Sequence, residues 1–104
     1  MPSMRIRAQV NDGVTTVKCL MNHEMETGLR KDKETGAPIP AHFIREVIAK
    51  WKDTVVMTAY WSGGVSKNPY LSFKFEGGAP GDAVEVSWTD NLGQSESATT
   101  EIAA

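Results

Sequence analysis

The chain of 104 residues contains a single cysteine, Cys19. Internal disulfides and thiolate-cluster metal sites need at least two cysteines, so the sequence excludes both. It also lacks a run of about 18 apolar residues that could span a bilayer. The N-terminal stretch MPSMRIRAQV has no apolar core of the kind that secretory signals carry. Taken alone, these absences predict a protein that stays in the compartment where it is made.

An excess of one charge sign is missing as well. Eleven Lys and Arg residues against thirteen Asp and Glu residues leave a formal net charge of -2. Nucleic acids and anionic lipid surfaces recruit proteins through a broad positive field, which this balance does not provide. We therefore expect neither nucleic acid nor membrane as a partner. The length fits one domain, residues 1–104, with one modest core.

What the chain does contain is a series of short stretches in which apolar and polar residues alternate. Met4, Ile6, Ala8 and Val10 alternate with polar residues, and Asn11-Asp12-Gly13 then provides a turn. A period of two is typical of strands that bury one face. The expected strands are residues 4–10, 14–21, 41–51, 55–61, 71–75, 84–88 and 94–102.

Three of these stretches carry more detailed expectations. Residues 41–51 also fit a helical stripe, but their β-branched and aromatic content favours a strand. Residues 94–102 are polar and are expected at the edge of a sheet. Val55, Met57, Ala59 and Trp61 are expected to share one face. Seven short strands with frequent turns predict an all-β, immunoglobulin-like antiparallel β-sandwich, although the Cys…Trp…Cys spacing of true immunoglobulin domains is absent.

Two segments carry more chemistry than a plain connection needs. Residues 20–32, LMNHEMETGLRKD, crowd two Met, one His, three acids and two bases between strands. Residues 65–70, VSKNPY, follow a Gly-Gly break. Between the first segment and the next strand, residues 33–40, KETGAPIP, predict an irregular connection. Loops held by a rigid scaffold are frequent binding sites, so we expect contacts with other macromolecules here.

Catalytic or metal chemistry is the alternative interpretation. Cys19, His23, Met25 and His42 could offer a blue-copper ligand set, but a strand cysteine points into the core whereas His23 already lies in a loop. A small metal or enzymatic site built on His23, Glu26 and His42, with Glu24 nearby, stays open. Cys19 itself is expected to be a small buried hydrophobe. The two histidines are expected individually at the surface, with His23 bonding backbone groups of the loop.

The two unusual segments together resemble the SoxZ family of sulfur-oxidation proteins. The similarity runs over nearly the whole chain. It is carried by His23-x-Met25-Glu26-Thr27-Gly28-x-Arg30-Lys31-Asp32, then Ile39-Pro40, Val65-Ser66-x-Asn68-Pro69-Tyr70 and Trp88-x-Asp90-Asn91-x-Gly93.

This resemblance implies an immunoglobulin-like sandwich with no catalytic activity and no cofactor. Such proteins pair with SoxY, whose glycine-rich C-terminal arm bears the cysteine that carries sulfur intermediates of thiosulfate oxidation from enzyme to enzyme. The present chain ends in Glu101-Ile102-Ala103-Ala104, so we do not expect it to be the carrying subunit. The expected partner-binding residues are His23, Met25, Glu26, Gly28, Arg30, Lys31, Asp32, Asn68, Pro69 and Tyr70.

Localisation is where the two interpretations differ. The bare sequence predicts the cytoplasm, whereas the resemblance implies the periplasm, reached by co-export with SoxY. We adopt the periplasm as the expectation. An exposed interface or edge strand would also favour self-association of the isolated chain.

Overall fold

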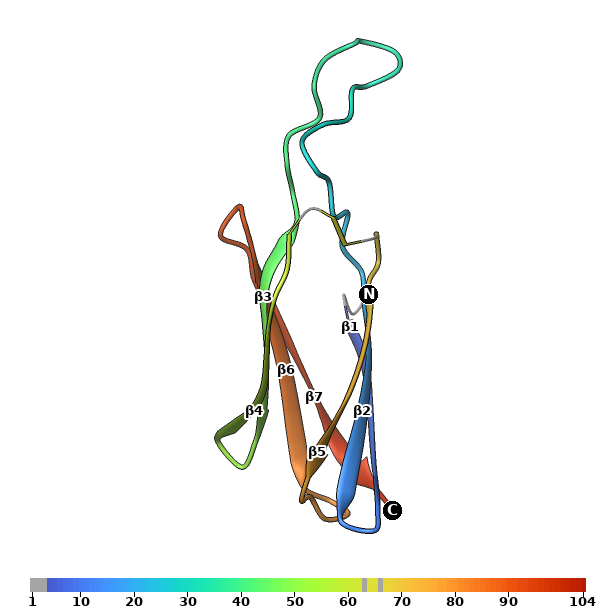
Figure 1. Cartoon of the computed structure of the whole chain (residues 1–104), viewed down its shortest axis with the longest axis vertical. Helices are drawn as coiled ribbons and strands as arrows, with labels where there is room; N and C mark the ends of the chain where they lie inside the picture. Colours follow the sequence, from blue (N-terminus) through green and yellow to red (C-terminus); the bar gives the residue numbers. More distant parts are fainter. Residues whose placement is uncertain (1–3, 63, 66) are drawn as a thin grey trace.

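The computed structural model describes residues 4–62, 64–65 and 67–104 and shows seven strands in one mixed sheet (Figure 1). The strands are β1 (Met4–Asn11), β2 (Val14–Met21), β3 (Ile44–Trp51), β4 (Thr54–Tyr60), β5 (Tyr70–Glu76), β6 (Ala83–Asp90) and β7 (Ser95–Ala103). These ranges contain no helix, so nothing in them has the helical length and apolarity that a membrane crossing needs. The expected all-β class with seven strands is confirmed.

The strands follow the hydrogen-bonded order β4-β3-β6-β7-β1-β2-β5. In Figure 1, β3, β4 and β6 lie opposite β1, β2 and β5, and β7 lies between the two groups. The strongly curved sheet is nearly barrel-shaped and is consistent with an immunoglobulin-like β-sandwich. Its two free edges are β4 and β5.

One pairing departs from the expected antiparallel arrangement, because β1 and β7 pair in parallel through Ala8↔Ile102 and Gln9↔Ala103. The other pairings in the sheet are antiparallel. The chain reverses direction at every connection, so the first and the seventh strand run the same way. They can therefore join only as parallel neighbours.

Two-residue turns fix the register of two hairpins. Asp12 and Gly13 connect β1 to β2 with φ angles of 52° and 75°, and Lys52 and Asp53 connect β3 to β4 with φ angles of 50° and 61°. Two successive positive φ angles match the right-handed twist of the flanking strands. The first turn lies where the sequence predicts it, and the second falls in the gap between the expected strands 41–51 and 55–61.

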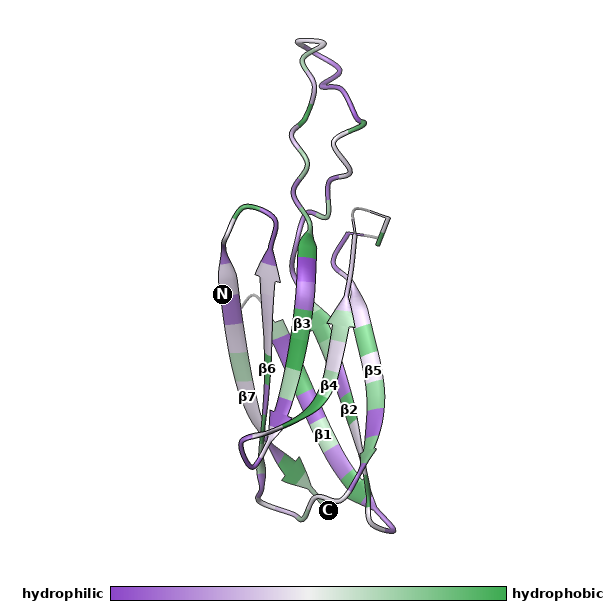
Figure 2. Ribbon diagram, turned by 60° about the vertical axis from the view of Figure 1, so that its left-hand side comes forward, coloured by the Kyte–Doolittle hydropathy of each residue, from purple (hydrophilic) through white to green (hydrophobic). Residues whose placement is uncertain are grey.

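The core forms between the inner faces of the curved sheet, whose alternation is visible as polar and apolar bands along β1 and β5 (Figure 2). Cys19 belongs to it, as the sequence predicts, and so does Trp88. The buried apolar side chains are Met4, Ala8, Val17, Cys19, Met21, Met25, Ile44, Val47, Ala49, Val84, Val86, Trp88 and Ile102.

Two sequence predictions about individual strands are wrong. Val55 does not share the inner face of β4, because the register between β3 and β4 shifts at Ala49 and Lys50 and leaves Val55 half exposed. Such a bulge moves the residues on one side of it to the opposite face of the sheet. The polar strand β7 is not an edge, since it lies between β6 and β1. Its inner face is filled by small residues and by Ile102, so a central position needs little apolar sequence.

Trp88 offers a direct test of the core. Its side chain is almost fully buried on β6, so Trp88→Ala should lower the free energy of unfolding by about 3 to 5 kcal/mol. Chemical denaturation followed by far-UV circular dichroism measures this loss. Thr89→Ala, an exposed neighbour on the same strand, is the matched control and should change stability little. A near-zero loss for Trp88→Ala would place that side chain at an interface instead of in the core.

Candidate functional site

Three connections meet at one end of the molecule. Because the strands alternate in direction, the connections β2–β3, β4–β5 and β6–β7 all lie at the same end (Figure 1). The first of them, residues 22–43, is the longest, and it projects well beyond the strands. We call residues 22–43 the arm. The two unusual sequence segments therefore lie side by side in space.

The arm is held by its own backbone hydrogen bonds. Glu26 and His42 pair across its base through two backbone bonds of 2.6 and 3.0 Å. Farther out, Ile39 N–H donates to the Arg30 carbonyl at 2.9 Å, and Lys31 bridges to Pro38. These contacts make the arm an irregular, twisted ladder instead of a free loop.

Charged side chains of the arm are used within it. The Arg30 guanidinium donates two hydrogen bonds to the Glu26 carboxylate, at 2.7 and 3.2 Å, and these bonds hold the pKa of Glu26 below its usual value. The Asp32 carboxylate accepts from the amides of Glu34 and Thr35 at 2.8 and 3.2 Å, which lowers the pKa of Asp32. Arg30 and Asp32 thus help to shape the surface on which they are exposed.

The base of the arm is joined to the β4–β5 connection. His23 N–H donates to the Asn68 side-chain oxygen at 3.0 Å, and Asn68 N–H donates back to the His23 carbonyl at 2.9 Å. Met21 N–H donates to the carbonyl of Pro69 at 3.0 Å. Asn68 has a φ angle of 51°, a region in which asparagine is strongly over-represented. The Asn-Pro pair of the second segment therefore holds the first segment in place through hydrogen bonds.

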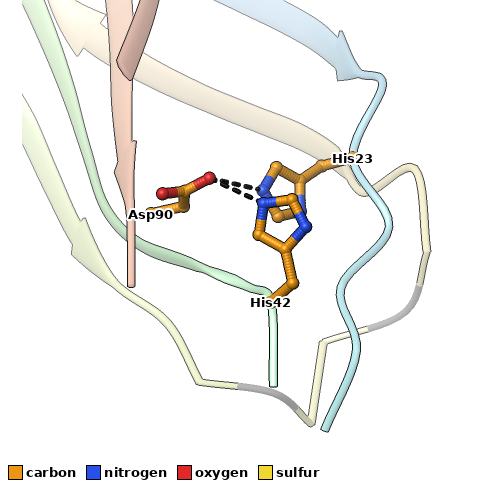
Figure 3. A group of neighbouring side chains, drawn as sticks. All are labelled: His23, His42 and Asp90. Atoms are coloured by element: carbon orange, nitrogen blue, oxygen red, sulfur yellow. Dashed lines mark hydrogen bonds and ion pairs between the residues drawn. The ribbon is translucent and has the colours of Figure 1, made fainter. Parts of the chain in front are cut away.

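The centre of this end is a buried carboxylate that both histidines approach (Figure 3). Asp90, the last residue of β6, is fully buried, and its Oδ2 lies 3.2 Å from His23 Nε2 and 2.8 Å from His42 Nε2. Its Oδ1 accepts from the amides of Leu92 and Gln94 at 3.0 and 2.9 Å. One side chain thus connects both ends of the arm to the β6–β7 turn.

Asn91 adds to this connection. Its side-chain oxygen accepts from Phe43 N–H at 2.8 Å, its amide nitrogen donates to the Ala41 carbonyl at 2.9 Å, and its backbone N–H donates to the Phe43 carbonyl at 3.0 Å. Beneath the arm, Met25 is buried and its sulfur accepts from Ile44 N–H. The returning end of the arm is therefore fixed over several residues.

The hydrogen-bond pattern decides which nitrogen of His23 carries the proton. Met25 N–H donates to His23 Nδ1 at 3.1 Å, so Nδ1 holds a lone pair. Nε2 then carries the hydrogen and donates it to Asp90. The His23 ring also packs edge-on against Trp88, with ring centroids 5.0 Å apart. His23 is thus a neutral, buried bridge between the arm and the core.

The pKa of Asp90 reflects two opposing influences. Burial alone would raise it, because the charged form loses hydration. Hydrogen bonds from His42, the Gln94 amide, His23 and the Leu92 amide outweigh burial and hold the pKa of Asp90 below its usual value. The carboxylate therefore stays ionised within the fold.

His23, His42 and Asp90 are also the group of side chains in the described ranges whose atoms are close enough to hold a metal ion, within 4.8 Å of one another. The expected alternative set is not assembled, since Glu26 bonds Arg30 and Asp90 occupies the place beside the histidines. A metal-bound imidazole normally donates its other N–H to an acceptor. Here the other nitrogen of His23 faces a donor, the Met25 amide. The geometry therefore fits a hydrogen-bonded bridge better than a metal centre.

The predicted partner-binding residues fall into two groups. His23 and Met25 are buried, as is Pro69, so the expected surface position of His23 is wrong, whereas its expected hydrogen bond to the loop backbone is confirmed. His42 is only half-buried. Glu26 and Gly28 are half-buried, and Arg30, Lys31, Asp32, Asn68 and Tyr70 are exposed. Ser66, part of the second motif, lies outside the described residues.

Sequence reasoning missed two residues at this end. Asp90 reads as an ordinary turn residue, although an acid that ends an apolar strand is a usable signal for a buried polar contact. Leu29, an unassigned position within the first motif, is 90% exposed on the arm. A large apolar side chain in that setting is a candidate anchor for a partner.

The fold and this end define a small β-sandwich protein with a braced, projecting arm. The family model of the sulphur oxidation protein SoxZ matches residues 4–101. The chain therefore belongs to the SoxZ family and has a role in sulfur oxidation. No curated protein sequence is significantly similar to it.

Asp90→Asn tests the buried bridge. The amide loses the charge that four donors stabilise, so the free energy of unfolding at neutral pH should fall by about 2 to 4 kcal/mol. The folded pKa is depressed, so the contribution of Asp90 is present above the ordinary carboxyl range and is lost as pH falls through the folded pKa. The difference between wild type and variant should therefore shrink on acidification below pH about 4.

Denaturant unfolding at several pH values measures this difference. Glu85→Gln removes an exposed carboxylate from the same strand and should change stability little at any pH. A constant difference for Asp90→Asn between neutral and acidic pH would contradict the ionised bridge.

Metal addition tests the tautomer. Isothermal titration of Zn²⁺ into the purified chain should show no binding of one equivalent at micromolar concentration, because a metal on His23 Nε2 would force two N–H groups against each other. His23→Gln, which removes an imidazole, should give the same titration curve. Stoichiometric zinc binding that is lost in His23→Gln would contradict the hydrogen-bonded assignment.

Proposed function

We propose that the chain is the non-catalytic subunit of a two-protein sulfur carrier. In this role it binds SoxY, whose mobile cysteine holds the sulfur intermediates, and it presents the pair to the enzymes of thiosulfate oxidation. Membership of the SoxZ family supports a role in sulfur oxidation. The assignment to SoxY and to a carrier follows from the likeness of the sequence motifs to that family.

The observation that carries the proposal is the position of the large exposed apolar side chains. Large exposed apolar side chains gather at the arm end: on the arm, at the adjoining ends of β2, β4 and β5, and in the β6–β7 turn. They are Leu20, Leu29, Tyr60, Tyr70 and Leu92. Val55 is the exception, beside the turn at the opposite end. Tyrosine and exposed leucine near a polar rim are typical of protein interfaces.

The lone cysteine is unsuited to carrying sulfur itself. Cys19 is fully buried on β2, and burial raises the pKa of its thiol to about 11. The thiolate is the reactive form, so this thiol is both inaccessible and protonated. A covalent carrier also needs a cysteine that can travel between active sites, which a central strand does not permit. The sulfur-bearing thiol therefore belongs to the partner.

The braced arm suits a binding role. Its hydrogen bonds to Asp90, Asn91 and Asn68 are made before any partner arrives, so little ordering entropy remains to be lost on binding. Exposed Arg30, Lys31, Asp32 and Tyr70 are candidates for direct contact, while His23 and Met25 would act from beneath by holding the arm. We place the complex with SoxY at this end. Function in the periplasm, after co-export with SoxY, is part of the same proposal.

Leu29→Ser tests the proposal. Co-expression with the SoxY of the same organism should yield a stable one-to-one complex on size exclusion. The variant should weaken that complex by about 5- to 30-fold, which corresponds to about 1 to 2 kcal/mol for an exposed anchor. The melting temperature of the free chain should stay unchanged, because Leu29 is almost fully exposed.

Val55→Ser is the matched control, since it removes an exposed apolar side chain at the opposite end. It should leave the affinity for SoxY unchanged. If the wild-type chain and SoxY elute separately at micromolar concentration, the proposed function is wrong. Equal weakening by the two variants would instead mean that the arm end is not the binding surface.

A further inference from the structure

A second surface stands apart from the arm end. The outward side chains of β1, β2 and β5 form registered rows across the sheet: Arg7 lies beside Lys18, and Lys18 lies beside Ser72. The row on one side contains Arg5, Leu20 and Tyr70, and the row on the other contains Gln9, Thr16 and Lys74. We call Arg5, Arg7, Lys18 and Lys74 the basic face.

The basic face is hollowed and has little internal compensation. A shallow hollow of about 810 Å³ runs over it, lined by Arg7, Lys18 and Lys74 together with neutral residues and one acid, Glu101. Among the ion pairs of the described residues, none involves a base of this face. Four of the eleven basic residues of a chain with net charge -2 therefore lie on one surface, none of them in a close ion pair with a described residue.

One contact within the face works against stability. Arg7 and Lys18 are direct cross-strand partners, and like charges directly opposite each other destabilise a sheet. An acid at either position would form a favourable pair. Two bases side by side therefore point to a role outside the fold, as a place where negative charge on another molecule is accepted.

The character of the face indicates what that molecule is. Charged residues are depleted from the cores of permanent interfaces, whereas complementary charges speed the encounter of transient partners. Glu101 within the hollow disfavours a uniform polyanion, and Leu20 with Tyr70 at its border offers apolar contact to a protein. We infer that the basic face is a docking site for the acidic surface of a protein that binds transiently. This inference rests on the proposed carrier role, from which we identify the transient partner as an enzyme of thiosulfate oxidation.

Lys18→Glu is the decisive variant because it separates binding from folding. It pairs a new carboxylate with Arg7, so the melting temperature should stay the same or rise. In the intact complex with SoxY, the rate constant for association with at least one purified enzyme of the system should fall about tenfold or more at low salt. The loss should shrink as salt rises from about 20 to about 200 mM, because screening weakens the interaction.

Arg45→Glu is the matched control. It makes the same charge change at an exposed position on β3, which is not a neighbour of β1, β2 or β5 in the sheet. It should slow association less than about twofold through net charge alone. Equal slowing by the two variants, or slowing by neither, would overturn the inference.

Further measurements distinguish other occupants. Size exclusion of the Lys18→Glu chain with SoxY should show an intact complex; if Lys18→Glu abolishes it while Arg45→Glu does not, the face belongs to the permanent interface and the inference fails. If the wild-type chain does not bind SoxY at all, the proposed function is wrong. The association rates of the free chain with the enzymes, with and without Lys18→Glu, then test the inference about the basic face. Lys18-dependent binding of a short DNA duplex, of phosphatidylglycerol vesicles or of a second copy of the chain would also overturn the inference.

Discussion

The arm end depends on a buried negative charge. The side chain of Asp90 has no exposure to solvent, and a carboxylate in that position is costly unless donors surround it. Two imidazoles on the arm and two backbone amides of the β6–β7 connection provide them. Because the charge must keep its donors, the arm must keep its two ends in place. The position of the whole projecting segment follows from that constraint.

The local pattern of the sequence was enough to predict the strands. The alternation of apolar residues such as Val84, Val86 and Trp88 with polar residues directly predicts a strand with one buried face, and Asp12-Gly13 predicts a turn. The failures have a different origin. The bulge that turns Val55 outward and the central place of β7 depend on the neighbouring strand, which the local pattern does not describe.

The candidate site was predictable only in part for the same reason. Its residues came from two recognisable motifs, yet the contact that organises them joins His23 to Asp90 across 67 positions of sequence. A lone histidine in a polar loop carries no local sign that it is buried. The sequence likewise gives no sign of the positive φ angle of Met25, since methionine rarely adopts such an angle. The surrounding hydrogen bonds impose that conformation.

Exposed apolar side chains gather at the arm end and exposed bases gather on the basic face. These two surfaces suit interactions of different lifetime. In the proposed carrier role, the chain keeps one partner while it exchanges others, and a single surface cannot do both at once. Apolar side chains on a braced scaffold, such as Leu29 on the arm, favour slow dissociation because little order remains to be gained or lost. Exposed bases without a close ion pair favour fast and salt-sensitive encounters.

The Arg7–Lys18 pair illustrates that a surface for recognition is not the surface that stability alone would favour. A stable fold alone would replace one of the bases with an acid, since cross-strand attraction would then add to stability. The core formed around Val17 and Cys19 beneath the pair is fully buried, so the sheet tolerates the repulsion at its surface. Stability comes from the inner face of β1 and β2, which leaves the outer face free to serve recognition.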